Sequence, residues 1–421
     1  MRKCLQLCVL LFSIVLLVGF GRVQAQSETG VLITSDAVSP GYVLFAPAKS
    51  TTTYLVNNAG EVVHTWESRY ITGHATYLKP NGNLLRAGSY PTSIYTAGGS
   101  GGIIEEIDWN GNVVWSYIVA DAQRHAHHDY ELLPNGNILI IAWEGYSVEA
   151  AAAAGRRPEL MPEGLLWSEV IIEVDPRSNQ VVWEWRAWDH LVQDYDPNLL
   201  NYGDVMANPG KIDINYLGAR AVGSDWLHFN AIDYNADLNQ IMLSTPFLQE
   251  VWIIDHGLTT EQAAGPAGDL LYRFGNRAAY KAPGGPSLSS QHDAEWLSND
   301  RAILFNNGTT RGWSSVDEWT LPIQPDGTYI READGTFRSP GIVWQFRRDD
   351  FFADRVSGAQ RLPNGNTLIA EGPEGRILEV QPDYTVVWEY VSPFAPEDNP
   401  QIFRAERYPP DYPAFVGRGL P

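Results

Sequence analysis

Histidine recurs at one position of a repeated sequence unit. When the units are aligned on the proline of a Pro-Asn-Gly turn or its equivalent, the residue six positions earlier is His74, His128, His228, His292 or Ser357. Neutral imidazole is a common metal ligand, and it also serves as a nucleophile and a general acid or base. Equivalent positions of a repeat meet around a common axis, so we predict that the four histidines line one small space.

The alternative interpretation is structural, because residues in register also pack one repeat unit against the next. Histidine is an inefficient packing residue, which favours a functional cluster. The remaining histidines do not share the register, which favours the same interpretation; they are His64, His125, His127, His190 and His256.

Two chemistries suit four histidines at an axis. The first is metal binding, where an all-histidine site with open positions would suit iron. The second is metal-free covalent catalysis, with one histidine as nucleophile and the others stabilising an anionic transferring group. Asp129 and Asp293 directly follow two of the histidines. Because neighbouring side chains of a strand point to opposite faces, each aspartate orients another group or caps a turn.

The unit that carries the histidine has three parts. It opens with a strand-like pair of aliphatic residues followed by an aromatic residue, as in Val113-Val114-Trp115. A turn such as Pro134-Asn135-Gly136 follows, which is a strong hairpin signal. The unit closes with an outer strand such as 103–108. Openings stand at Val62, Val113, Val181, Leu270, Ile342 and Val386.

About four short strands per unit and six openings predict an all-β fold, a six-bladed β-propeller. The segment 41–60 is strand-like without an opening of its own, and the opening at Val386 has no full unit after it. We therefore expect the N- and C-terminal strands to pair and close the ring, which removes open sheet edges. A pair of β-sandwiches is the alternative, but it does not explain the recurring unit.

We expect residues 26–421 to form a single propeller domain with two irregular parts. An insertion at about 149–225, between the second and third turn units, contains a short helix near 150–154 and long loops. Such a connection is typical of a lid or binding loop, with a surface excursion as the alternative. The tail at about 393–421 contains the proline-rich segment 403–413, which we expect to pack on the ring without forming a strand.

The first residues predict a secretory signal at 1–25. Arg2 and Lys3 precede an apolar run at 5–20, and cleavage is expected after Ala25. A membrane anchor is the alternative, but the run is short for a span. We therefore expect a secreted or periplasmic protein that has no membrane contact after cleavage.

Cysteine content and charge narrow the chemistry further. Cys4 and Cys8 both lie within the predicted signal, so the mature chain would have neither a disulfide nor a thiolate nucleophile. The formal net charge is −21 and no basic stripe is present. Nucleic acid is therefore a poor partner, and an anionic substrate needs a locally positive site.

Several motifs, in order along the chain, resemble the bacterial arylsulfotransferase family. They are His128-Asp129, Asp225-Trp226-Leu227-His228-Phe229-Asn230, Ser290-Gln291-His292-Asp293-Ala294, Phe305-Asn306-Asn307-Gly308 and Phe403-Arg404-Ala405-Glu406-Arg407-Tyr408. The resemblance implies a secreted six-bladed propeller that moves a sulfuryl group from a phenolic sulfate to a phenol. It implies no nucleotide donor, no cofactor and no metal, and a histidine that carries the group between the two half-reactions.

Carried over by motif, the resemblance makes His292 the nucleophile. His128 and His228 would stabilise the sulfate oxygens and act as general acid or base. His74 is an additional candidate for substrate binding because it shares the register, and Asn307 is a further candidate. Pro246 stands where the family has an arginine that grips the sulfate, so Arg311, or else Arg277, is expected to supply that charge. The family's cysteine pair is absent from the mature chain.

Two functions from other classes stay open at this point. One is a propeller that binds a ligand or partner without chemistry. The other is a metal-dependent enzyme that uses His74, His128, His228 and His292.

Overall fold

The computed structural model describes residues 29–218, 222–394 and 399–421. The predicted signal at 1–25, together with Cys4 and Cys8, lies outside the described residues. The described chain forms a six-bladed β-propeller, which confirms the predicted fold class. The blades are named A to F in their order around the ring, starting with the blade that contains residues 42–47.

Each blade is an antiparallel sheet whose strands run from the axis outwards. Blade A contains β27 (Ile402–Tyr408), β2 (Tyr42–Pro47), β3 (Thr52–Val56) and β4 (Val62–Glu67). Blade B contains β5 (Thr72–Leu78), β6 (Leu84–Ser89), β7 (Gly102–Ile107) and β8 (Val113–Ile118). Blade C contains β9 (Arg124–Leu132), β10 (Ile138–Tyr146), β11 (Leu166–Asp175) and β12 (Gln180–Arg186).

The other three blades follow the same plan. Blade D contains β15 (Ala231–Asn235), β16 (Gln240–Thr245), β17 (Glu250–Asp255) and β18 (Tyr272–Phe274). Blade E contains β19 (His292–Ser298), β20 (Arg301–Asn306), β21 (Ser315–Thr320) and β22 (Gly341–Phe346). Blade F contains β23 (Gly358–Arg361), β24 (Thr367–Glu371), β25 (Arg376–Val380), β26 (Val386–Val391) and, as a fifth strand, β1 (Gly30–Thr34).

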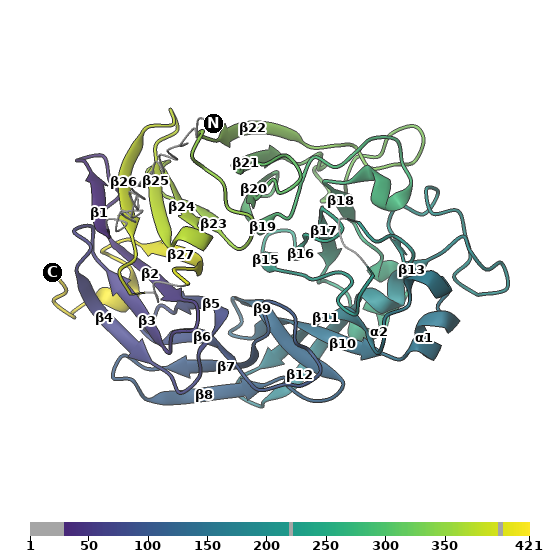
Figure 1. Cartoon of the computed structure of the whole chain (residues 1–421), viewed down its shortest axis with the longest axis horizontal. Coiled ribbons are helices and arrows are strands. Elements are labelled where there is room, and N and C mark those ends of the chain that lie inside the picture. Colours follow the sequence, from purple (N-terminus) through teal and green to yellow (C-terminus); the bar gives the residue numbers. More distant parts are fainter. Residues whose placement is uncertain (1–28, 219–221, 395–398) are drawn as a thin grey trace, which may run out of the picture.

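The inner strands surround the axis (Figure 1). In order around the ring they are β27, β5, β9, β15, β19 and β23, and each contacts the next, including β23 with β27. The first residues of these strands therefore meet at one end of the central channel, which is what an active site built from several blades requires.

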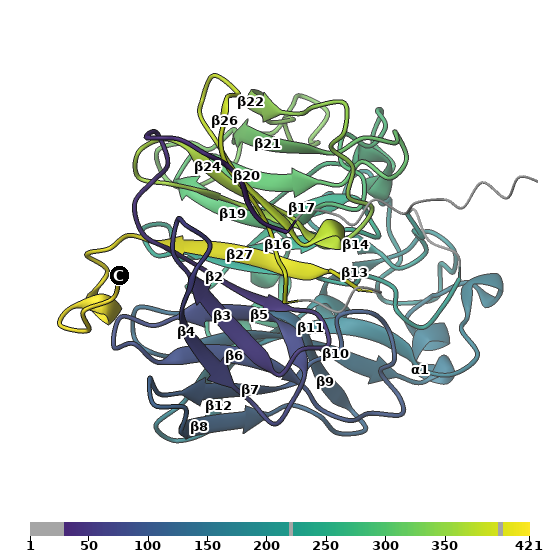
Figure 2. The same cartoon turned by 60° about the vertical axis from the view of Figure 1, so that its left-hand side comes forward.

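The two ends of the described chain enter different blades. At the N-terminal end, β1 pairs with β26 on the outside of blade F. At the C-terminal end, β27 pairs with β2 and is the innermost strand of blade A (Figure 2). The interpretation of 403–413 as a tail without a strand was therefore wrong. Its prolines, Pro409, Pro410 and Pro413, follow the strand and do not interrupt it.

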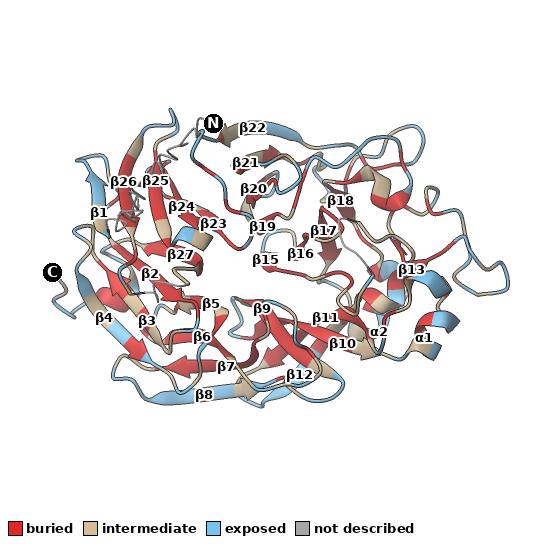
Figure 3. Ribbon diagram, viewed as in Figure 1, coloured by how far each residue is buried: buried red, intermediate tan, exposed pale blue. Residues whose placement is uncertain are grey.

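The aromatic openings of the sequence units form the fourth strands of the blades, counted from the axis, and the strands interpreted as outer, such as β7, lie one place further in. Figure 3 shows the difference in burial, with β8 and β22 largely exposed and the middle strands buried. Val114 on β8 is 54% exposed, whereas Ile104 on β7 is 2% exposed. The phase of the unit was misassigned because both strand types carry aliphatic residues.

Two connections depart from the repeated plan. Helix α1 (Val148–Ala153) lies between β10 and β11. In the segment between blades C and D, the described residues include a 3-10 helix (Ala187–His190) and a short parallel pair, β13 (Leu191–Val192) and β14 (Ile212–Asp213). The one other α-helix of the described chain, α2 (Thr260–Ala263), lies between β17 and β18. The described residues contain no helix with the length and apolar character that a membrane crossing requires.

Candidate functional site

The histidines sit on irregular backbone at the start of the inner strands. His74, His128 and His228 have φ values of +96°, +52° and +57°. The register of the β5–β6 pair shifts at His74, and the register of the β9–β10 pair shifts at His128, as in a β-bulge. Residues other than glycine rarely adopt positive φ values, and such backbone strain concentrates at functional sites. The bulges re-aim the imidazoles towards the channel.

His292 departs from the common register by one residue. In blade E the residue with positive φ is Asp293, at +56°, and the register of β19 shifts after His292. In blade F the equivalent position is Ser357, at +87°. The sequence alignment on the turn therefore places His292 one residue away from its structural equivalents, although its side chain reaches the same space.

Three of the four predicted histidines lie around the ring of Phe403, and the fourth, His228, packs against His128. The ring of His128 lies 5.5 Å from that of His74 and 4.5 Å from that of His228. Phe403 of β27 lies 4.9 Å from the His74 ring and 6.5 Å from the His292 ring. His128 and His292 are 4% and 8% exposed. The predicted cluster thus forms, in a site with little access to water.

His292 is held in a single tautomer. Its Nδ1 lies 2.8 Å from Asn307 Oδ1 and 2.9 Å from the carbonyl oxygen of Ser290. Both partners only accept hydrogen bonds, because Asn307 uses its amide nitrogen to donate to the carbonyls of Ala353 and Val356. Nδ1 therefore carries the hydrogen and Nε2 keeps its lone pair. Burial lowers the pKa of His292 to about 4, against weaker opposing effects of its hydrogen bonds, so the ring is neutral near pH 7.

His228 is paired with a carboxylate. Its Nδ1 donates to Asp225 Oδ2 at 2.5 Å, and its ring stacks on Phe247 at 4.2 Å. Asp225 is three residues earlier in the chain and belongs to the motif that carries His228. A carboxylate that accepts from Nδ1 fixes the orientation of an imidazole, so Asp225 positions the His228 ring within the cluster.

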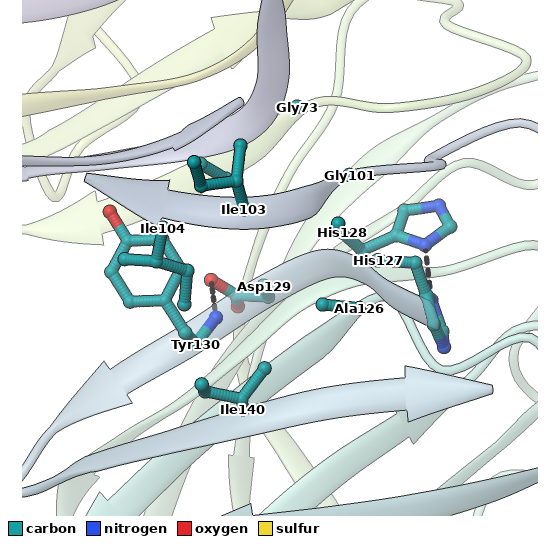
Figure 4. A pocket seen from close by; sticks show the side chains of 12 residues that line it. Gly73, Gly101, Ile103, Ile104, Ala126, His127, His128, Asp129, Tyr130 and Ile140 are labelled. Atoms are coloured by element: carbon teal, nitrogen blue, oxygen red, sulfur yellow. Dashed lines mark hydrogen bonds between the residues drawn. The ribbon is translucent and has the colours of Figure 1, made fainter. Parts of the chain in front are cut away.

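His128 is bonded to a second histidine that the sequence reasoning left outside the site. The Nδ1 atoms of His127 and His128 lie 2.8 Å apart, and Figure 4 shows this bond beside the buried face of β9. The Nε2 atom of His127 lies 2.8 Å from Glu169 Oε2 on β11. His127 stacks on Trp143 at 3.9 Å. A register count could not find His127 or Glu169, because neither occupies the repeated position.

Arg404 is the buried cation beneath the cluster. It lies on β27, is 4% exposed, and its Nη2 atom contacts Asp129 Oδ2 at 3.0 Å and Asp293 Oδ1 at 2.9 Å. Its charge also contributes to the lowered pKa values of His74, to about 4, and of His292, although burial is the larger cause for both. Asp129 and Asp293 therefore hold an arginine from another blade and do not touch their own histidines' rings.

The two arginines expected to replace the missing family arginine are engaged elsewhere. Arg311 donates to the carbonyls of Trp313 and Asn306 and to Ser315 Oγ, and it stacks on Trp313. Arg277 donates to the carbonyls of Pro283 and Phe337. Asn307, predicted to bind substrate, spends its side chain on His292 and the backbone. Asn307 therefore supports His292 directly, whereas the two arginines bond residues outside the histidine cluster.

The donor geometry bears on the metal alternative. Across residues 29–218, 222–394 and 399–421, no group of three or more His, Cys, Asp or Glu side chains is arranged to hold a metal ion. The Nδ1 atoms of His128, His228 and His292 are each already hydrogen-bonded to protein.

Two pockets adjoin the cluster. One, of about 10 Å³, lies between β7 and β9 beside His127 and His128 and is too small for a substrate (Figure 4). The other, of about 290 Å³, is lined by Thr96, Ala97, Trp167, Val222, Gly223, Ser224 and Asp225. Asp225 links this second pocket directly to His228, and its size suits an aromatic ring.

A family model for arylsulfotransferase (ASST) matches residues 31–386 of the chain. The chain belongs to the arylsulfotransferase family. The matched range includes all four predicted histidines. Membership of this family implies a sulfotransferase that acts on small aryl sulfates and phenols. The cluster at the channel is therefore the candidate active site of an arylsulfotransferase.

Solved structures show the likeness of the fold alone. A protein of unknown function from Bacteroides caccae is 13% identical, with a TM-score of 0.50, and the match covers 87% of this chain and 98% of that one. A catalytically inactive virginiamycin B lyase from Staphylococcus aureus with quinupristin is 11% identical, with a TM-score of 0.40, over 86% of this chain and 88% of that one. No curated protein matches the sequence significantly.

Gly99 holds the ring of His128 in place in this arylsulfotransferase. A Cβ atom at Gly99 would lie 1.9 Å from His128 Cε1, and the φ of Gly99 is +85°. We expect Gly99→Ala to displace the His128 ring and to lower sulfuryl transfer by about 10²-fold, since misplacements near 1 Å have such effects. Steady-state transfer from 4-nitrophenyl sulfate to phenol measures the loss.

The neighbouring glycine supplies a matched control for Gly99→Ala. A Cβ atom at Gly98 would meet no atom within 4 Å. Gly98→Ala should therefore keep wild-type transfer. Equal activity of the two variants would show that the close approach of Gly99 does not position His128.

Proposed function

We propose that this arylsulfotransferase moves a sulfuryl group from a phenolic sulfate ester to a phenol through a sulfohistidine at His292, without a nucleotide donor. The observation that carries the proposal is the fixed tautomer of His292. Two acceptors hold its Nδ1–H, so the Nε2 lone pair is free at neutral pH. An oriented, neutral imidazole is a suitable nucleophile for sulfur.

The other three histidines supply the hydrogen bonds that an anionic group needs. In the first half-reaction, His292 Nε2 forms a bond to sulfur while the bond from sulfur to the phenolic oxygen breaks. The electron pair of that bond stays on the phenolate. His228, with Asp225 behind it, donates a proton or a hydrogen bond to the leaving oxygen, and His74 and His128 face the same space.

The second half-reaction reverses these bonds with a different phenol. The acceptor loses its hydroxyl proton to a neutral imidazole and attacks sulfur, and the electron pair of the sulfur–nitrogen bond returns to His292 Nε2. His128 is suited to accept the proton, because burial keeps its pKa well below the usual value and the ring starts neutral.

The aryl group has a place beside the histidines. The pocket of about 290 Å³ ends at Asp225 and has Trp167 in its wall. Trp167 packs 5.1 Å from Tyr95 and 5.4 Å from Trp143, and Trp143 stacks on His127. An aromatic wall of this kind favours a flat ring over an aliphatic group.

Mass spectrometry of the protein mixed with 4-nitrophenyl sulfate tests the proposal. We expect one sulfuryl group per chain, located on His292, and its removal when phenol is added. Release of nitrophenol should rise with the phenol concentration. Nitrophenol release without an adduct and without dependence on phenol would overturn the sulfohistidine mechanism, and no release by folded protein would overturn the aryl sulfate donor.

We also propose that the enzyme works outside the cytoplasm, in the periplasm or after secretion. The support is the sequence of residues 1–25, with its basic start, apolar run and small residue at Ala25.

A further inference from the structure

Three buried side chains form a line of hydrogen bonds that ends at the site. Glu169 Oε2 lies 2.8 Å from His127 Nε2, and His127 Nδ1 lies 2.8 Å from His128 Nδ1. The side chains of Glu169 and His127 are completely buried, and His128 is 4% exposed. Glu169 comes from β11 and both histidines from β9, so two strands of blade C hold the line together.

The surroundings fix each member of this line. Glu169 Oε1 accepts a hydrogen bond from the backbone nitrogen of Phe229 at 3.0 Å, which leaves Oε2 for His127. The His127 ring is stacked on Trp143, and the His128 ring packs against Gly99. The three groups therefore cannot turn away from one another without moving the blade.

The line admits two arrangements of protons. When Glu169 is ionised, His127 donates from Nε2 and accepts at Nδ1, so His128 donates from Nδ1 and has a free lone pair on Nε2. When Glu169 is protonated, every bond reverses, and His128 carries a hydrogen on Nε2. The two arrangements differ by one proton in total, and both imidazoles are neutral in each.

We propose that Glu169 and His127 are positioning residues that set the tautomer of His128, so that His128 alternates between base and acid. This inference rests on the proposed function of the site. As the acceptor phenol attacks, its proton moves to His128 Nε2, the Nδ1 proton of His128 moves to His127 Nδ1, and the Nε2 proton of His127 moves to Glu169 Oε2. The reverse sequence returns a proton to a leaving phenolate.

The charges around the line favour neutral imidazoles. Burial is the main cause that lowers the pKa values of His127 and His128, and the neighbouring His228 and His74 lower both further, with His125 acting on His127 and His292 on His128. Burial, with the nearby charge of Asp225, raises the pKa of Glu169 well above its usual value, against hydrogen bonds from the backbone of Phe229 and His228. Both directions favour the transfer of a proton from either ring to Glu169.

Glu169→Gln tests this proposal, because glutamine keeps the size of the side chain and cannot take up a proton. The nitrophenolate of 4-nitrophenyl sulfate leaves without needing a proton, so the burst of nitrophenol should keep its rate. Transfer from the sulfated enzyme to phenol should fall by about 10²-fold, the usual effect of general base catalysis. The acidic limb of the pH profile of that transfer should also disappear.

Glu173→Gln is the matched control. Glu173 lies on the same strand, is 5% exposed, and contacts His256 Nε2 at 2.8 Å, which reproduces the glutamate–histidine pair away from the cluster. It should leave both half-reactions unchanged. If Glu169→Gln slowed the burst and the transfer equally, or neither, the proposal would be overturned.

A second measurement needs no substrate and no variant. Long-range proton–nitrogen NMR of ¹⁵N-histidine-labelled wild-type protein reports the tautomer of each ring. His127 and His128 should switch tautomer together as the pH changes, with neither becoming an imidazolium. Protonation of His128 alone, or no joint switch, would overturn the proposal. If aryl sulfates are not turned over but the joint switch occurs, the proposed function fails and the relay stands.

Discussion

Replacement of His292 by alanine should reduce nitrophenol release from 4-nitrophenyl sulfate by about 10⁴-fold or more, because the variant lacks the atom that accepts the sulfuryl group. Transfer to phenol and the covalent adduct should vanish with it. The fold should be retained, since His292 is held by only two hydrogen bonds from its Nδ1 and packs at the edge of the channel. A burst experiment with a colorimetric readout measures the effect.

His256→Ala is the comparison for this result. His256 is bonded through both of its ring nitrogens, to Asn239 and Glu173, but its contacts lie between blades C and D and involve no member of the cluster. It should keep wild-type transfer. Substantial nitrophenol release by folded His292→Ala would contradict the role of His292 and direct attention to His128, whose ring lies 4.5 Å from that of His228.

Arg404→Met should lower the free energy of unfolding by about 3–5 kcal/mol, which is the usual cost of removing one partner of a buried ion pair. Arg404 compensates two buried carboxylates at once, since its Nη2 atom lies 3.0 Å from Asp129 and 2.9 Å from Asp293. Methionine fills much of the volume, so the loss reports charge more than packing. Urea denaturation measures the change.

Removal of the two carboxylates should restore part of the stability that Arg404→Met loses. The triple variant with Asp129→Asn and Asp293→Asn no longer has the two carboxylates that Arg404→Met leaves without their cation. Arg177→Met, which breaks the exposed pair with Asp175, is expected to change the free energy by less than about 0.5 kcal/mol. An equally small change for Arg404→Met would show that Asp129 and Asp293 are neutral in the folded protein.

The recurring turn and aromatic pattern was enough to predict the propeller and the meeting of the histidines. Each unit carries its own hairpin signal, and rotation about one axis brings His74, His128 and His228 together. The displacement of His292 was not predictable, because it depends on a bulge in β19 that puts positive φ on Asp293. Backbone irregularity of this kind leaves no trace in hydrophobic periodicity.

The contact of Glu169 with His127 and the place of Arg404 in the site could not be predicted from the sequence, for physical reasons. Glu169 meets His127 across the intervening strand β10, and no motif spacing describes a contact between alternate strands of a blade. Residues 402–407 are all buried, so β27 shows no alternation between apolar and polar residues. The prolines that follow that strand then outweighed its pattern. Arg404 was therefore quoted as part of a motif without a place beside the histidines.

The position of β27 in the sequence bears on how the enzyme is made. As the chain is synthesised, β2 to β4 emerge early but lack their inner strand until 402–408 is complete. Phe403 and Arg404, which form the wall and floor of the histidine cluster, arrive with that same strand. An incomplete chain therefore has most of its histidines and no assembled site. Catalytic competence coincides with the last step of ring assembly, so nascent or prematurely terminated chains cannot react with phenolic sulfates.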